Sequence, residues 1–271
     1  MKALALTLDQ AYGTAIEAAL EAGRILRWHF QRGLEIRHKG AIDLVTEADV
    51  AAEQAALSRI QRTFPAHAVL SEESGGMDRA SPWLWVVDPL DGTTNFAHGF
   101  PVFAVSIALL HEGQRMIGVV YDVMRDELFT ARHGQGAFLN GRPIRVTQTP
   151  RLENALLVTG FPYDRQESPL DNTCEFVALL RRCHGVLRVG SAALDLASVA
   201  AGRLDGYWEF RLSPWDLAAG ALLVEEAGGL VTTPLGDPLP PLGTDIVATN
   251  GRIHAELLEV LIQCRKELPK P

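Results

Sequence analysis

A run of acidic, glycine and hydroxyl residues follows the apolar segment Trp83–Val87 and carries the clearest chemical signal in the chain. It reads Asp88-Pro89-Leu90-Asp91-Gly92-Thr93-Thr94-Asn95-Phe96. The glycine and threonines would expose backbone N–H groups at the start of a helical turn, which is a site that binds anions. Two carboxylates repel an anion unless a cation lies between them, so the pattern predicts a metal-assisted anion site. A plain turn is the alternative, since Asp, Pro and Gly all favour turns.

Glu72-Glu73 is a second acidic pair, directly after the predicted buried strand Ala68–Ser71. Strands that are adjacent in sequence are usually neighbours in a sheet. If this strand lies beside the one that ends at Asp88, the carboxyl ends of both strands lie together. A solvated loop is the alternative explanation of the pair.

Two further acids lie at predicted helix starts. Asp216 is the third helical residue after Ser213 as N-cap and Pro214 as first residue. Asp49 belongs to a capping box that begins at Thr46. Capping alone can account for both acids.

The elements that position these acids fall into two groups. In the first group the sequence predicts helices over 11–30 and from residue 46. Strands follow over 68–71 and 83–88, then a meander over 103–131 and a hairpin at Asn140-Gly141. The second alternates strands near 156–159, 186–189, 207–210 and 246–249 with helices over 170–183, 191–201, 214–227 and 253–266, which is typical of an α/β unit. We therefore predict two domains, residues 1–149 and 150–271.

Composition narrows the classes of protein. The 271 residues are 47% hydrophobic and 21% charged, which excludes a disordered or low-complexity chain. No apolar run is long enough to cross a membrane. The net charge of −8 and the lack of a long basic cluster argue against nucleic acid as the primary partner. Three cysteines without metal-ligand spacing and no clear signal peptide predict a cytoplasmic protein.

Four motifs, in order along the chain, resemble the signatures of the inositol monophosphatase family. They are Asp43-Leu44-Val45-Thr46 with Asp49, Ser71-Glu72-Glu73-Ser74, Asp88 to Phe96, and Trp215-Asp216-Leu217-Ala218-Ala219-Gly220 with Glu226-Ala227-Gly228-Gly229. The resemblance implies a layered α-β-α-β-α sandwich of the sugar-phosphatase type, with an N-terminal antiparallel-sheet half and a C-terminal mixed-sheet α/β half. It also implies a homodimer and inhibition by Li⁺.

The resemblance further implies a phosphatase with two to three Mg²⁺ ions in each active site. Glu72, Asp88 and the Leu90 carbonyl would hold one ion, Asp88, Asp91 and Asp216 a second, and Glu72 would help to hold a weaker third. Oxygen ligands without His or Cys suit Mg²⁺. Each carboxylate pair at ~4 Å costs roughly 4 kcal/mol at an effective dielectric constant of 20, so four ionised carboxylates crowd together only around a cation.

The implied reaction has no covalent phospho-enzyme. Glu72 and the Thr93 hydroxyl would orient an activated water for in-line attack on phosphorus, while backbone N–H groups of Gly92 and Thr93 bind the phosphate oxygens. Thr46 and Asp49 would assist in catalysis. Lys39, Asp43 and Glu73 would lie one layer further out, around the metal ligands and their waters.

The substrate's hydroxyl groups would meet a second set of residues. Gly190, Ser191 and Ala192 precede a helix and would offer N–H groups, and Glu209 resembles the family's hydroxyl-binding carboxylate. Asp91, Gly92, Thr93 and Asp216 would also contact the substrate. Residues 161–164 would line the entrance.

We therefore expect a phosphomonoesterase that acts on a small polyol or sugar phosphate, first of all myo-inositol 1-phosphate. Other phosphatases of the same chemistry are the alternatives: fructose-1,6-bisphosphatase, a dual-activity phosphatase, histidinol-phosphate phosphatase and a 3′-phosphonucleotide phosphatase. A non-catalytic regulatory binding protein on the same scaffold is the alternative of a different class.

Overall fold

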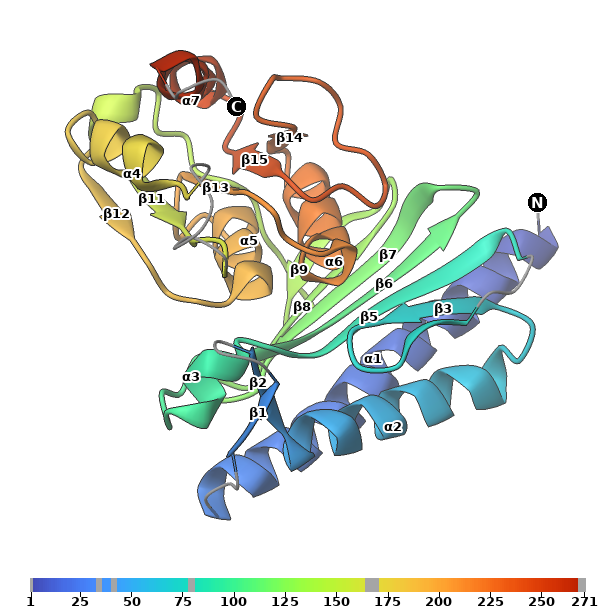
Figure 1. Cartoon of the computed structure of the whole chain (residues 1–271). Helices are drawn as coiled ribbons and strands as arrows, with labels where there is room; N and C mark the ends of the chain where they lie inside the picture. The colour runs from blue at the N-terminus through green and yellow to red at the C-terminus, as the bar shows by residue number, and fades with distance from the viewer. Residues whose placement is uncertain (1, 33–35, 40–42, 78–80, 164–170, 268–271) are drawn as a thin grey trace.

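The computed structural model describes residues 2–32, 36–39, 43–77, 81–163 and 171–267, and it forms five alternating layers of helices and sheets (Figure 1). The helices are α1 Lys2–Arg32, α2 Glu47–Thr63, α3 Thr93–Ala97, α4 Thr173–Leu180, α5 Ala192–Ala200, α6 Pro214–Glu226 and α7 His254–Glu267, with a 3₁₀ turn at Leu152–Asn154. The predicted α-β-α-β-α sandwich is confirmed.

The first sheet has eight strands from the first half of the chain. They are β3 Ala68–Ser71, β4 Gly75–Met77, β5 Trp83–Asp91, β6 Ala104–His111, β7 Gln114–Asp122, β8 Glu127–Arg132, β9 Gly136–Leu139 and β10 Arg142–Pro143. Their order is β10-β9-β8-β7-β6-β5-β3-β4. All pairs are antiparallel except β3 with β5, which run parallel with Ser71 opposite Val87. The expectation that these two strands are neighbours is thus confirmed.

The second sheet has five strands from the other half. They are β11 Leu156–Thr159, β12 Gly185–Leu187, β13 Gly206–Glu209, β14 Leu230–Thr232 and β15 Ile246–Thr249, in the order β12-β11-β13-β15-β14. Strand β11 runs parallel to both β12 and β13, whereas β15 is antiparallel to its neighbours. This is the mixed sheet that the resemblance implied.

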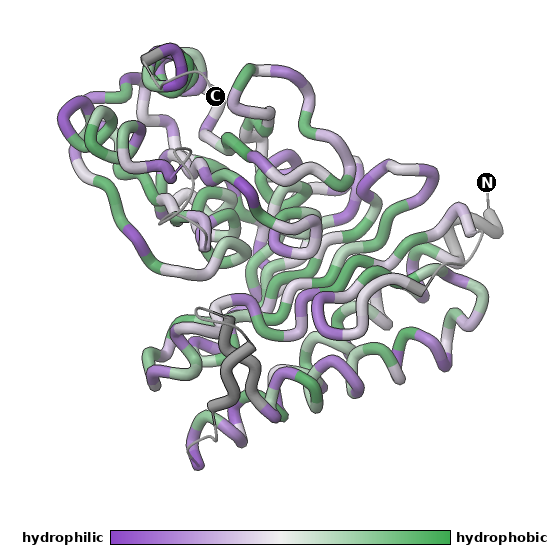
Figure 2. Tube along the Cα trace, in the orientation of Figure 1, coloured by the Kyte–Doolittle hydropathy of each residue, from purple (hydrophilic) through white to green (hydrophobic). Residues whose placement is uncertain are grey.

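The layers are held by three apolar cores. Helices α1 and α2 pack their alanine-rich faces on one side of the first sheet, around Trp85 and Phe103. Helices α5 and α6 fill the space between the two sheets, against Ala108 and Val120 on one side and Tyr207 on the other. Helices α4 and α7 cover the outer side of the second sheet. Figure 2 shows the matching pattern, with hydrophobic stretches along the strands of the first sheet.

Most predicted elements are present with shifted ends. Helix α1 begins at Lys2 rather than near Ala11, and α4 is confined to Thr173–Leu180. The Asn140-Gly141 hairpin joins β9 to β10, and both residues have positive φ, as a tight turn requires. The hairpin of β1 Ile36–Lys39 with β2 Asp43–Thr46 and the short strands β4 and β14 were not predicted, because three or four residues show too little periodicity.

The predicted boundary at 149/150 falls between the last strand of the first sheet and the first strand of the second. Division into two domains stays a prediction, since α5 and α6 pack on both sheets. Within the described residues, no helix is long and apolar enough to cross a membrane.

Candidate active site

An irregularity near the end of β5 turns two acids toward one cavity. In a regular strand, residues three apart point to opposite faces. Here the register of β5 with β6 shifts between Asp88 and Asp91, and the Leu90 N–H donates to Asp88 Oδ1 at 3.0 Å. The shift lets both carboxylates line the same cavity. Asp88 is 1% exposed.

Glu72 reaches the cavity from the neighbouring strand. It follows Ser71, the last residue of β3, and its N–H donates to the Val87 carbonyl of β5 at 3.3 Å. The parallel pairing therefore brings the two acidic motifs together, as the sequence predicted. The Glu72 side chain lines the same cavity as Asp88 and Asp91.

Asp216 arrives from the other half of the chain and serves two purposes. It is the third residue of α6, and its Oδ2 accepts from the Ser213 N–H at 2.7 Å in a capping box. Asp88, Asp91 and Asp216 each offer a carboxylate oxygen, and these oxygens all lie within 4.8 Å of one another. Asp216 therefore both caps α6 and belongs to the acidic cluster.

The electrostatics of the cluster call for a cation. Burial raises the pKa of Asp88 well above its usual range, and four other carboxylates, led by Glu72 and Asp91, push it further in the same direction. Burial and then the Asp91 charge likewise raise the pKa of Asp216. A divalent cation among these oxygens would remove the repulsion. Hard oxygen donors of this kind fit Mg²⁺.

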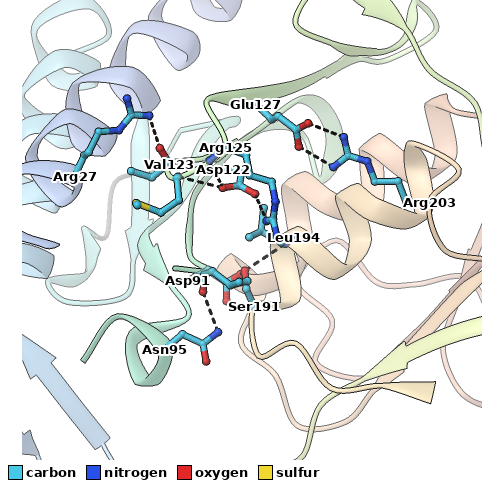
Figure 3. A network of polar contacts seen from close by, with 12 residues as sticks. Arg27, Asp91, Asn95, Asp122, Val123, Arg125, Glu127, Ser191, Leu194 and Arg203 are labelled. Carbon is cyan, nitrogen blue, oxygen red and sulfur yellow. Dashed lines mark hydrogen bonds and ion pairs between the residues drawn. The ribbon is translucent and has the colours of Figure 1, made fainter. Parts of the chain in front are cut away.

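Asp91 accepts more hydrogen bonds than Asp88 or Asp216, because the start of a helix donates to it. It accepts the Ser191 hydroxyl and the N–H groups of Ala192 at 3.2 Å and Ala193 at 2.8 Å, at the start of α5 (Figure 3). Burial raises the pKa of Asp91 to about 6, against the lowering effect of these bonds. Of the N–H groups expected to bind sugar hydroxyls, that of Ala192 donates to Asp91, and contact of Gly190, Ser191 and Ala192 with substrate stays a prediction.

Gly92 and α3 form one wall of the cavity. Gly92 has φ 98°, and a Cβ there would lie 3.0 Å from the Val102 carbonyl oxygen, so a side chain is excluded by strain and space. Helix α3 begins at Thr93, and the N–H groups of a first helical turn lack acceptors within the helix. The Thr93 hydroxyl donates to the Leu90 carbonyl at 3.0 Å. That carbonyl has a second lone pair for another partner.

Glu209 also lines the cavity, at the end of β13. It is 8% exposed and accepts from the Tyr207 hydroxyl at 2.7 Å. Burial, and less strongly the Asp91 charge, raise its pKa to about 7, while the Tyr207 hydrogen bond and the Arg188 charge act in the opposite direction. A Cβ at Gly160 would collide with this carboxylate, so the glycine makes room for it.

Three residues of this corner were missed by the sequence analysis. Arg188 lines the cavity, Tyr207 is fully buried against Glu209, and Asp195 is a buried acid whose pKa is raised by burial and then by the Glu209 charge. Arg188 follows a three-residue strand and Asp195 lies inside a helix, so neither stood in a recognisable motif.

The remaining predicted residues are placed less directly. Asp49 is fully buried in α2, and its charge contributes to the raised pKa of Asp88. Glu73 lines a separate groove against α2. Lys39, Asp43 and Thr46 belong to the hairpin β1–β2, whose second strand lies beside α3, but their side chains fall outside what the structure describes.

The entrance was predicted at residues 161–164. Phe161 and Tyr163 line the cavity, and Asp164 lies outside the described residues. The cavity has a volume of about 120 Å³, enough for a small ligand group rather than a polymer.

A layered α/β sandwich with buried carboxylates grouped beside helix starts is the arrangement expected of a metal-dependent phosphomonoesterase. Comparison with known proteins supports this class. The model of the Inositol monophosphatase family matches residues 7–268. The chain therefore belongs to the inositol monophosphatase family, and Asp88, Asp91 and Asp216 are the acidic metal-binding triad typical of its Mg²⁺-dependent members.

Similar proteins carry two kinds of name. The chain is 50% identical to an inositol-1-monophosphatase of Synechocystis sp., covering 91% of this chain and 87% of that protein. It is 47% identical to the Nus factor SuhB of Pseudomonas aeruginosa, covering 91% and 94%. Among solved structures, an inositol monophosphatase from Anabaena (Nostoc) sp. superposes with a TM-score of 0.88 at 48% identity, covering 97% of this chain and 98% of that one.

Proposed function

We propose that this protein hydrolyses phosphate monoesters of small polyols with Mg²⁺, and that myo-inositol 1-phosphate is its preferred substrate. The observation that carries the proposal is that two unlike groups line one cavity. The first is the carboxylate cluster Asp88, Asp91 and Asp216, and the second is the buried acceptor Glu209. The first suits a phosphate held through a cation, and the second suits an uncharged hydroxyl.

The residues of the chain divide the work as follows. Glu72, Asp88, Asp91, Asp216 and the Leu90 carbonyl would hold Mg²⁺, which supplies charge stabilisation and activates the attacking water when bound. Glu72 and the Thr93 hydroxyl orient that water. The N–H groups of Gly92 and Thr93 bind phosphate oxygens, where negative charge develops in the transition state.

Glu209 fixes the alcohol part of the ester. Its carboxyl oxygens accept hydrogen bonds from ring hydroxyls, and Tyr207 holds the carboxyl in place. Positioning of this kind aligns the leaving oxygen with the water on the far side of phosphorus. Thr46, Asp49, Lys39 and Asp43 support the water and the metal ligands from the layer behind.

The test is a panel of esters with the purified chain and Mg²⁺. It comprises myo-inositol 1-phosphate, fructose 1,6-bisphosphate, histidinol phosphate and a 3′-phosphonucleotide. We expect kcat/KM to be at least tenfold higher for the inositol ester than for the others. A tenfold preference for the bisphosphate would overturn the choice of substrate while keeping the reaction class.

Similarity to a Nus factor SuhB favours a second candidate, a regulatory role on the same scaffold. Folded protein that binds Mg²⁺ and releases no phosphate from any ester of the panel would favour this role alone.

We also propose that the protein is a cytoplasmic homodimer, inhibited by Li⁺, with domains 1–149 and 150–271. Ultracentrifugation and a Li⁺ titration test the dimer and the inhibition.

A further inference from the structure

One buried glutamate outside the cavity has a precise relation to Glu72. Glu53 lies on α2, is 5% exposed, and faces the turn that joins β3 to β4. Its Oε2 accepts the Ser71 hydroxyl, the Glu73 N–H at 3.0 Å and the Ser74 N–H at 3.4 Å. Three donors from one turn thus converge on a single carboxylate oxygen.

These three donors surround Glu72 in the sequence. Ser71 precedes it, and Glu73 and Ser74 follow it. The Glu72 N–H itself donates to the Val87 carbonyl, one residue before Asp88. The backbone of Glu72 is therefore tied to β5 on one side and to α2 on the other, which leaves its Cα–Cβ direction little freedom.

The consequence is visible in where the two adjacent glutamates point. Glu72 lines the cavity with Asp88 and Asp91, whereas Glu73 lines a groove on the α2 side together with Glu53 and Gln54. A backbone rotation in this turn would exchange or misdirect the two side chains. The contacts with Glu53 oppose such a rotation.

A carboxylate is the group best suited to this task. Hydrogen bonds from N–H and O–H donors to an ionised acceptor are shorter and stronger than those to a neutral one. An amide keeps one acceptor oxygen of the same shape without the charge, and an alanine removes the acceptor and leaves the buried Ser71 hydroxyl and two backbone N–H groups without it.

We infer that Glu53 is a positioning residue for the reaction: it holds the Ser71–Ser74 turn so that Glu72 faces the metal cluster. The inference rests on the proposed function for its catalytic consequence, and on the contacts of the turn for its structural one. Glu53 touches neither substrate nor cavity, so it acts only through Glu72.

The experiment compares Glu53→Ala, Glu53→Gln and the matched control Gln54→Ala with the full wild-type chain. Gln54 is an exposed neighbour that lines the same groove. For Glu53→Ala we expect kcat on myo-inositol 1-phosphate to fall about 10- to 100-fold with KM within twofold, because Glu209 and Gly92 are untouched. The Mg²⁺ concentration that gives half-maximal activity should rise about three- to tenfold. Glu53→Gln should recover at least a third of the lost kcat on a logarithmic scale, and Gln54→Ala should match wild type.

Two readouts do not depend on hydrolysis. Hydrogen exchange of the Glu73 and Ser74 amides should accelerate at least tenfold in Glu53→Ala and stay unchanged in Gln54→Ala. Calorimetric titration with Mg²⁺ alone should show the weaker binding directly. If wild type hydrolyses none of the esters, the proposed function fails while these readouts still test the role of Glu53.

Three results would overturn the inference. One is a folded Glu53→Ala protein with kcat and Mg²⁺ affinity within twofold of wild type. Another is unchanged exchange at the two amides. The third is a loss of kcat that disappears at a lower temperature in step with the recovery of folded protein, because that would be a stability effect alone.

Discussion

The two ends of the cavity bury acids in different ways. Asp88 and Asp216 accept backbone N–H groups, from Leu90 and Ser213, and are otherwise surrounded by other carboxylates. Glu209 accepts a hydroxyl from Tyr207, and the Arg188 cation partly offsets the effects of burial and of the Asp91 charge on its pKa. At the first end, a cation from solution would relieve the repulsion between carboxylates. At the second end, groups of the chain itself offset part of the cost of burial.

We expect this difference to assign phosphate affinity to the acidic cluster with its cation, and the choice of ester to Glu209. A site that depends on an external cation responds to Mg²⁺ concentration, and phosphate binding then follows the metal. Glu209, whose pKa is about 7, can accept hydrogen bonds from hydroxyl groups without requiring an ion. We therefore expect changes at one end to alter the metal response, and changes at the other to alter the choice of ester.

The largest effect is expected from Asp88→Asn, which keeps the shape of the side chain and removes its charge. Hydrolysis at saturating Mg²⁺ should fall at least 100-fold. The metal-free protein should gain roughly 1–3 kcal/mol of stability, since a buried charge without a partner is removed. Steady-state kinetics and urea unfolding with EDTA measure the two quantities. A variant that keeps activity within threefold would contradict a metal-binding role for Asp88.

Glu209→Gln should sharpen the comparison from the other end. We expect kcat/KM for myo-inositol 1-phosphate to fall about 10- to 50-fold, or about 1.4–2.3 kcal/mol of transition-state stabilisation. The rate with p-nitrophenyl phosphate, which has no ring hydroxyls, should change less than threefold. Mg²⁺ half-saturation should also stay within twofold. Equal losses on both esters would mean that Glu209 does not select the alcohol.

The smallest effect is a pH dependence of the metal-free protein. Folding raises the pKa of Asp91 to about 6 and of Glu209 to about 7, above ordinary values near 4. Groups with raised pKa contribute stability that is fully present below their unfolded pKa and is lost as pH rises through the folded pKa. The melting temperature in EDTA should therefore fall between pH 5 and pH 8.

Adding Mg²⁺ should flatten this pH dependence. Binding at 100 times Kd stabilises a protein by about 2.7 kcal/mol, which is roughly 5–10 °C for a chain of this size. The rise should be larger at pH 8 than at pH 5, because protons compete with the metal for the carboxylates. A rise of equal size at both pH values would argue that the ion binds elsewhere.

His254 provides an internal contrast of opposite sign. It lies between the hydroxyls of Thr232 and Thr249, and burial lowers its pKa to about 4. Its contribution is present above the unfolded value near 6.5 and is lost as pH falls toward 4. Lowering the pH from about 6.5 to 4 should therefore reduce the melting temperature through His254, a second decline that Mg²⁺ does not correct.

Local patterns predicted the two groups of elements and the neighbouring strands that carry Glu72 and Asp88, whereas the layered sandwich and the full acidic cluster were implied by the family resemblance. Asp88, Asp91 and Glu72 end apolar strands, and their convergence follows from parallel pairing of neighbours in sequence. Asp216 was ambiguous, because a helix cap and a metal ligand use the same residue at the same position. In the structure Asp216 does both: it accepts the Ser213 N–H in the capping box and belongs to the cluster with Asp88 and Asp91.

What sequence could not predict are the residues whose roles come from distant contacts. Glu53 looks like an ordinary polar residue of a helix until α2 is packed on β3. Arg188 and Asp195 lack any motif, and they meet Glu209 only after the second sheet forms. The use of the Ala192 and Ala193 N–H groups by Asp91 was missed for the same reason, since it joins segments a hundred residues apart.

That last contact has a consequence for biogenesis. Asp91 belongs to the first sheet, yet it caps α5, and Asn95 reinforces the same junction by donating to the carbonyls of Val189 and Gly190. A growing polypeptide therefore has neither the cap nor Asp216 until its second half has been made and docked. Filling of the site shared by Asp88, Asp91 and Asp216 would therefore report completed assembly, because a truncated product would lack one of its three carboxylates.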